Sequence, residues 1–153
     1  MALKGDRFIG VTDIGYHLNE VGEKGQICVY STFGSGAALD QGQALVTIAA
    51  VASGNTPAGL LLNDVVNKDL SRTHLNFQKD EIQQGGKVTL LKKGWVVSNR
   101  IVAGQTPTVG SKARLGTSGD VTATDAGGNP LLGEFKSSKD EDGYAKISID
   151  LPS

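Results

Sequence analysis

Histidine and cysteine side chains could bind a metal or attack a substrate, but the chain contains only His17, His74 and Cys28. Neither histidine has a second strong ligand at the spacing of a zinc site, and Cys28 has no partner in a C-x-x-C motif. A Cys–His nucleophile would require the tertiary fold to bring two distant residues together. We therefore expect no metal centre and no cofactor, a surface histidine, and a small buried or strand thiol.

Two further motifs resemble ligand-binding loops. The acidic turn Asp140-Glu141-Asp142-Gly143 could offer oxygen atoms to calcium, but it lacks the spaced ligands and distal glutamate of an EF-hand loop, which favours a solvated hairpin turn. Gly34-Ser35-Gly36 begins like a dinucleotide-binding motif, but Leu39 stands where the third glycine belongs. No serine lies in a G-x-S-x-G motif. The sequence predicts no catalytic residue, and we expect a protein that is not an enzyme.

Charge and hydropathy argue against nucleic-acid and membrane partners. The chain carries 15 basic and 16 acidic residues, so it lacks the basic excess of proteins that bind nucleic acid or anionic membranes. Lys92 and Lys93 beside Trp95 could bind nucleic acid, but a solvated hairpin tip with Trp95 in the core is favoured. The apolar run at 44–52 is far shorter than the roughly 20 residues that span a bilayer. We expect no signal peptide and, with one cysteine, no internal disulfide, and therefore synthesis in a cytoplasm.

Glycine is unusually frequent, with 21 residues spread along 153, which indicates many tight turns between short strands. The clearest alternation of apolar and polar residues predicts a strand whose core face holds Ala145, Ile147, Ile149 and Leu151. Residues 45–51 are rich in β-branched side chains, as is typical of a buried strand. We expect one all-β domain, a small β-barrel or sandwich of short antiparallel strands with one long loop.

Two hairpins are predicted in the second half of the chain. Residues 112–115 and 121–124 flank a turn-forming stretch at 116–120. Residues 87–91 and 95–97 flank Gly94, which we expect to adopt a positive φ at the turn.

An internal similarity links two parts of the chain. A strand at 26–30 precedes a β run and then a proline and a glycine-bearing apolar strand at 57–61; the same order recurs from 112–115 to 130–135. This order indicates either a duplicated β unit or only the shared grammar of hairpins, and two copies are too few for a solenoid.

The first 24 residues place apolar side chains among glycines and charges without a helical stripe. Such a segment gains little by folding alone, because each ordered residue costs about 1–2 kcal/mol of backbone entropy. We expect residues 1–24 to form an N-terminal arm outside a single β domain at 25–153. The competing interpretation is that this stretch is the first strand of the barrel.

Helix is expected only at 64–70, as a turn or two capped by Asn63. Residues 71–84 are polar and predict a long loop that contains Arg72, His74 and Phe77. This loop could order against a partner or remain an ordinary mobile loop.

A family resemblance follows from the order of the strand motifs. The succession Gly86-Lys87-Val88-Thr89-Leu90-Leu91-Lys92-Lys93-Gly94-Trp95-Val96-Val97, followed by the motifs at 109–115, 118–122 and 130–135 and a closing strand, resembles the small β-barrel capsid decoration (cement) and capsid-fibre proteins of tailed bacteriophages. The first 24 residues and the loop at 71–84 have no counterpart in that family's pattern, and its motifs are not catalytic.

The resemblance implies a structural virion protein on the outer surface of an icosahedral phage head, bound at junctions between major capsid protein subunits. It also implies association with copies of itself, as a dimer or trimer at a local symmetry axis. We expect capsid or inter-subunit contacts from the apolar N-terminal segment and the long loop, at Arg7, Phe8, Ile9, Ile14, Tyr16, Leu18, Arg72, His74 and Phe77. The alternatives are another virion subunit, from a tail tube or baseplate, and a small β-barrel ligand-binding module or enzyme.

Overall fold

The computed structural model describes residues 3, 7–18, 20–30, 44–48, 55–67, 81–84, 86–124 and 128–151. The expected all-β fold is confirmed, and the one helical turn among these residues is Thr117–Gly119. The strands are β1 (Phe8–Leu18), β2 (Ile27–Tyr30), β3 (Ala44–Ile48), β4 (Pro57–Leu61), β5 (Asp64–Val66), β6 (Glu81–Gln83), β7 (Lys87–Ser98), β8 (Lys112–Leu115), β9 (Val121–Thr122), β10 (Leu131–Phe135) and β11 (Ala145–Asp150).

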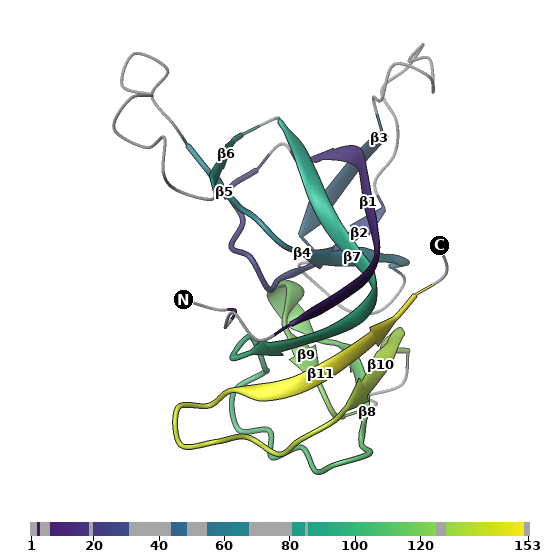
Figure 1. The fold of residues 1–153 in the computed structure, drawn as a ribbon, viewed down its shortest axis with the longest axis vertical. Coiled ribbons are helices and arrows are strands. Elements are labelled where there is room, and N and C mark those ends of the chain that lie inside the picture. The colour runs from purple at the N-terminus through teal and green to yellow at the C-terminus, as the bar shows by residue number, and fades with distance from the viewer. Residues whose placement is uncertain are drawn as a thin grey trace.

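Nine strands form one sheet that closes on itself twice, as the upper and lower halves of Figure 1 show. In the first ring, the order β1-β3-β2-β4-β7 closes because β1 also pairs with β7. In the second ring, the order β7-β11-β10-β8-β9 closes where β9 returns to the chain that follows β7. There the Val102 and Val121 amides donate to the carbonyls of Val121 and Arg100, each at 2.9 Å. Each ring is a small barrel, and both contain β7.

β7 runs through both rings as a single strand of 12 residues. Its first half pairs with β4, at Leu61↔Leu90, and its second half pairs with β11, at Ser148↔Trp95. The hairpin expected at 87–97 is therefore wrong. Gly94 has the predicted positive φ, of 147°, but β1 pairs with β7 on both sides of it, so the backbone makes an irregularity in the ladder instead of a turn.

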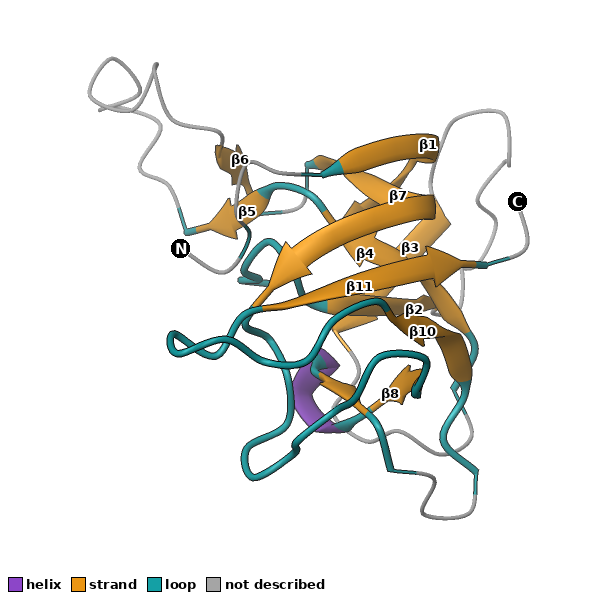
Figure 2. Cartoon of the chain, turned by 60° about the horizontal axis from the view of Figure 1, so that its bottom comes forward, coloured by secondary structure: helices purple, strands orange, loops and turns teal. Residues whose placement is uncertain are grey.

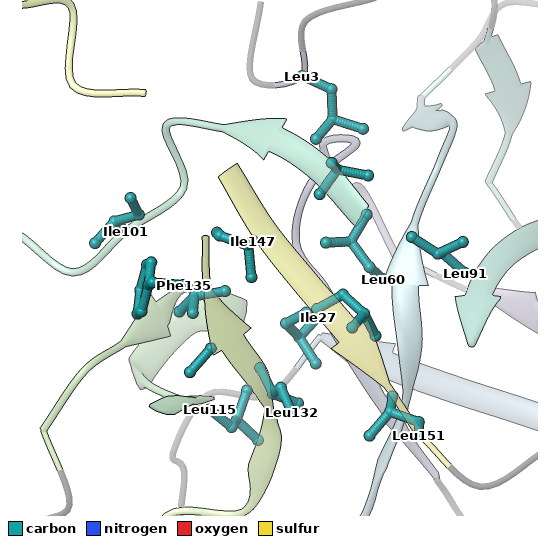
Figure 3. Packing of buried hydrophobic residues seen from close by; sticks show 14 of the residues in the cluster. Leu3, Ile27, Leu60, Leu91, Ile101, Leu115, Leu132, Phe135, Ile147 and Leu151 are labelled. Atoms are coloured by element: carbon teal, nitrogen blue, oxygen red, sulfur yellow. The ribbon is translucent and has the colours of Figure 1, made fainter. Parts of the chain in front are cut away.

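Two hydrophobic clusters fill the rings. Leu18, Cys28, Leu61 and Leu90 belong to the cluster of the first ring. The second cluster, drawn in Figure 3, extends from the second ring onto the other face of β2 and β4 and includes Leu3, Ile27, Leu60, Leu91, Ile101, Leu115, Leu132, Phe135, Ile147 and Leu151. Because β2 and β4 have a core on each face, their sequences are continuously apolar instead of alternating.

The predicted C-terminal strand is confirmed as β11, with Ile147 and Ile149 fully buried and Ser148 on the opposite face. The hairpin of β8 and β9 is also confirmed by the pairs Arg114↔Thr122 and Leu115↔Val121. The predicted strand at 45–51 corresponds to β3, and its last three residues lie outside the described part of the chain.

The helix expected from residue 64 is wrong. Residues 64–66 form β5, which pairs in parallel with β6, and the backbones of Val65 and Gly22 exchange two hydrogen bonds of 2.8 and 3.0 Å. Two consecutive β-branched valines favour extended backbone, and Val65 is buried in the first cluster. The end of the predicted loop, 81–83, is β6, while residues 71–80 lie outside the described part.

Residues 8–18 of the expected N-terminal arm form β1. This strand pairs antiparallel with β7 from Phe8↔Trp95 to His17↔Lys87 and parallel with β3 at Leu18↔Val46. This part of the segment is a strand of the first ring, as the competing interpretation held. The division of the chain at residue 24 remains a proposal for truncation to test.

Candidate interaction surface

β1 carries the largest group of exposed apolar side chains on the described surface. Phe8 is 56% exposed and Ile14 is 64% exposed, and Ile9 and Val11 are also exposed. β1 is interrupted by register shifts against β7 between Ile9 and Thr12 and again after Asp13. These shifts break the regular alternation, so consecutive side chains of β1 remain outside the core.

The predicted contact residues divide into three groups. Phe8, Ile9 and Ile14 are exposed, and Arg7 is partly exposed at the start of β1. Tyr16 is half-buried against the first cluster and Leu18 is fully buried within it, so the packing of the first ring accounts for both. Arg72, His74 and Phe77 lie outside the described residues. A contact role for any of the nine stays a prediction.

Phe8 lies at one end of a row of side chains across the outer face of the sheet. Phe8 pairs with Trp95, Trp95 with Ser148, Ser148 with Glu134, and Glu134 with Lys112. Trp95 was expected in the core, but Val96 is fully buried, so alternation along β7 turns Trp95 outward. The Lys146 ammonium lies 3.7 Å from the centre of the Trp95 ring and covers it.

Lys92 is buried, with 3% of its surface exposed, and does not lie at a solvated tip as expected. Its ammonium donates a hydrogen bond of 2.7 Å to the Tyr30 phenol oxygen and lies 5.0 and 5.9 Å from the ring centres of Tyr30 and Tyr16. Burial, followed by a hydrogen bond between the Tyr16 and Tyr30 side chains, raises the pKa of Tyr16 to about 12. One sequence signal could have predicted the burial of Lys92. It lies two residues after Leu90, which packs in the first cluster, and residues two apart on a strand face the same side.

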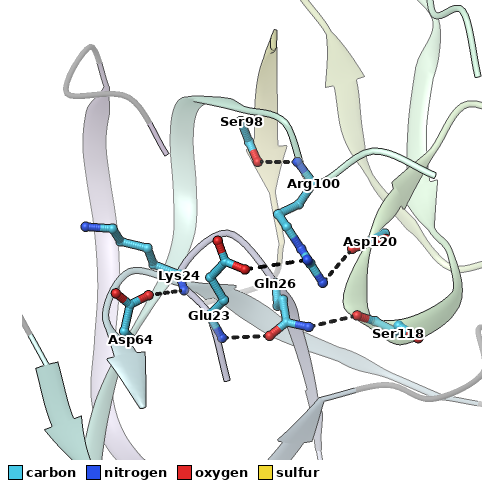
Figure 4. Close-up of polar contacts among 8 residues, drawn as sticks. All are labelled: Glu23, Lys24, Gln26, Asp64, Ser98, Arg100, Ser118 and Asp120. Carbon is cyan, nitrogen blue, oxygen red and sulfur yellow. Dashed lines mark hydrogen bonds and ion pairs between the residues drawn. The ribbon is translucent and has the colours of Figure 1, made fainter. Parts of the chain in front are cut away.

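A polar cluster joins the two rings, as Figure 4 shows. The Arg100 guanidinium lies 3.0 Å from the Asp120 carboxylate and 3.6 Å from that of Glu23. The Gln26 side-chain amide donates a 3.0 Å hydrogen bond to the Ser118 carbonyl. Burial raises the pKa of the Asp120 carboxyl; Arg100 opposes this rise and Glu23 adds to it. Sequence patterns gave no sign of this cluster, because its members come from separate turns.

The candidate chemical residues occupy structural positions. Cys28 is buried in the first cluster, and burial, with a smaller effect of Glu20, raises the pKa of its thiol to about 12, which disfavours the reactive thiolate. The Asp140 carboxylate accepts backbone hydrogen bonds of 2.9 Å from Asp142 and Tyr144 and thereby stabilises its own turn. Among the described residues, no three side chains of His, Cys, Asp or Glu are grouped to hold a metal ion.

The described chain is an all-β body, which Figure 2 colours by secondary structure. Exposed apolar side chains lie along its strand β1. Over the part of the chain that the structure describes, there is no helix of the length and hydropathy that a membrane span requires.

Comparison with protein families matches residues 12–150 to the family described as structural cement protein (E217 gp24/Pam3 gp6). A comparison with curated proteins gave no match. The family match runs from Thr12, within β1, to the end of β11 and so includes strands of both rings. The chain therefore belongs to the family of phage structural cement proteins.

Proposed function

We propose that this structural phage protein binds the outer surface of an icosahedral head and holds neighbouring major capsid protein subunits together. The observation that carries the proposal is the exposed apolar group on β1, formed by Phe8, Ile9, Val11 and Ile14, in a member of a cement family. Single exposed apolar residues are ordinary, but four on one strand, half of the large exposed hydrophobic residues on the described surface, indicate a contact surface. Their role is to bind and position; none takes part in a reaction.

The strength of such a contact comes from repetition. Burying apolar surface stabilises a complex by roughly 25 cal/mol per Å², from which the loss of rotational and translational freedom must be subtracted. A modest interface per copy is sufficient when the lattice repeats the site and neighbouring copies, as a dimer or trimer at a local symmetry axis, hold one another in place.

Co-sedimentation with purified heads that lack this protein tests the proposal. The double variant Phe8→Ser/Ile14→Ser is expected to weaken binding at least tenfold while its thermal midpoint stays near that of the wild type. Thr12→Ser, an exposed polar position on the same strand, is the matched control and should bind like the wild type. Wild-type protein that does not bind heads would refute the proposal, and full binding by the double variant would refute the role of β1 in it.

A further inference from the structure

The two rings have the same strand arrangement in the same chain order. In the first, β2 lies between β3 and β4, and β4 pairs with β7; in the second, β8 lies between β9 and β10, and β10 pairs with β11. All of these pairings are antiparallel. β4 in the first ring and β10 in the second each have one extra residue before a glycine, Ala58 before Gly59 and Leu132 before Gly133.

When the two rings are aligned on these bulges, their backbone hydrogen bonds coincide. Tyr30 corresponds to Leu115, and Lys92 corresponds to Ile149. Four backbone hydrogen bonds of the first ring have a counterpart in the second. Gly25 N to Leu61 O (2.7 Å) corresponds to Gly110 N to Phe135 O (2.8 Å), and Leu61 N to Gln26 O (2.9 Å) corresponds to Phe135 N to Ser111 O (2.7 Å). Tyr30 N to Thr56 O (3.1 Å) corresponds to Leu115 N to Pro130 O (2.9 Å), and Leu62 N to Thr89 O (3.0 Å) corresponds to Lys136 N to Lys146 O (2.7 Å).

The turn before β2 repeats before β8. The Gln26 backbone amide donates to the Glu23 carbonyl at 3.1 Å, and the Glu23 backbone amide donates back to the Gln26 side-chain oxygen at 2.7 Å. Ser111 and Thr108 make the same pair of bonds, at 3.0 and 3.3 Å. The pattern common to all short hairpins would reproduce the strand order, but it would not reproduce side-chain caps and bulges at corresponding positions.

The opening strands also correspond. β1 runs antiparallel to β7 and, at Leu18↔Val46, parallel to β3; the second half of β7 runs antiparallel to β11, and its continuation pairs in parallel at Ile101↔Val121. β7 is therefore both the last strand of the first unit and the first strand of the second.

The two units differ where the shared fold does not require it. Lys92 and the 41% exposed Tyr30 of the first unit replace the fully buried Ile149 and Leu115 of the second. Two of the connections are also longer in the first unit: residues 31–43 stand where the second has 116–120, and 62–86, which include β5 and β6, stand where it has 136–144.

Exposed apolar side chains follow the same division. Of the eight large hydrophobic residues exposed on the described surface, six belong to the first unit and only Val109 and Leu131 to the second. Exposed apolar groups and a buried lysine do not help a barrel to fold, and such departures from consistent folding patterns concentrate at functional sites. The second unit shows that the same fold forms with fewer exposed apolar side chains and, among its described residues, without a buried lysine.

We infer that the chain is a tandem duplication of one five-strand barrel and that its first unit, residues 8–92, binds the major capsid protein, while the second, residues 93–151, is the structural half. The assignment rests on the proposed function and specifies which half of the molecule faces the capsid. The duplication itself rests on the repeated strand order, bulges and hydrogen bonds, and not on the proposed function.

Val21 and Val109 provide a comparable test, because Val21 lies just before the first of the two corresponding turns, Val109 lies within the second, and they are 61% and 72% exposed. Val21→Asp is expected to weaken co-sedimentation with heads at least tenfold, and Val109→Asp should change it less than twofold. Thermal midpoints of both variants should stay near that of the wild type. Hydrogen exchange of the wild type with and without heads gives an independent measurement, in which amides of residues 8–92 should gain protection.

Binding by wild type with an equal or larger effect of Val109→Asp, or protection confined to 93–151, would overturn the assignment while the proposed function stands. The same holds if neither substitution alters binding and residues 8–92 gain no protection. Failure of the wild type to bind at all would instead refute the proposed function.

Discussion

The Lys92 ammonium hydrogen-bonds the Tyr30 phenol oxygen at 2.7 Å, across 62 positions of sequence, from a site that Ile149 occupies in the other ring. A buried lysine is destabilising unless its charge is compensated, and here a phenol and two aromatic rings supply the compensation. Lys92→Met keeps the packing volume and removes the charge, so we expect a free energy of unfolding within about 1 kcal/mol of the wild type.

Lys92→Ala should instead cost about 2–5 kcal/mol, because it leaves a cavity between the strands. Urea denaturation of both variants measures the difference. Equal losses in the two would show that the ammonium, and not the aliphatic stem, stabilises this end of the ring.

The alternation along β11 gives a second prediction. Ile147→Ala and Ile149→Ala should each lower the free energy of unfolding by about 2–5 kcal/mol, because both side chains are fully buried in the second cluster. Ser148→Ala, on the outer face between them, should be nearly neutral. Chemical denaturation checks all three, and similar losses at the three positions would contradict the assigned face of the strand.

Gly59 and Gly133 should respond differently although they occupy corresponding positions. A Cβ at Gly133 would overlap the Ser148 carbonyl oxygen, whereas a Cβ at Gly59 would meet Leu90 Cβ at 2.8 Å. We expect Gly133→Ala to cost about 3 kcal/mol or more and Gly59→Ala about 1–3 kcal/mol. Gly15→Ala, on exposed β1 with only the Asp13 side chain nearby, is the control. The reverse order of thermal midpoints would contradict the register of β10 and β11.

Cys28 predicts a loss of stability in alkali. Its folded pKa, about 12, exceeds its ordinary value of 9.0, so the contribution of the protonated thiol is complete below pH 9 and is lost as the pH rises toward 12. The wild type should therefore lose its advantage over Cys28→Ala by up to about 1.4 kcal/mol per pH unit above pH 9. Tyr16 has the same sign above pH 10 in both proteins. Parallel stability curves for the two proteins from pH 8 to 10.5 would show that the buried thiol does not control this loss.

Removal of residues 2–18 tests the proposed division of the chain at residue 24. Because β1 closes the first ring against β3 and β7, the truncated protein should lose cooperative unfolding of that ring. A truncated protein with an unchanged thermal midpoint would support a separate arm. Circular dichroism during heating distinguishes the two outcomes.

Sequence patterns predicted the elements whose cause is local. Ile147 and Ile149 alternate with polar residues, and the turn between β8 and β9 contains Gly116 and Gly119, so both features were predicted correctly. β7 was missed because Gly94 has the backbone of a turn residue, and the distant pairings with β1 and β11 keep the strand continuous. At the candidate site, Phe8, Ile9 and Ile14 were predicted as apolar residues without a core, but Leu18 was assigned to the same surface although β3 and β7 enclose it.

The continuous β7 has a mechanical consequence. Tension applied between the two rings along this strand is carried by its covalent backbone, and its ladders with β1 and β11 are loaded in shear, with many hydrogen bonds sharing the force. A flexible linker between separate barrels would transmit no such load until it was taut. β1 pairs with β7 on both sides of Gly94 and so reinforces the junction between the two rings. The two rings therefore resist stretching as one stiff element.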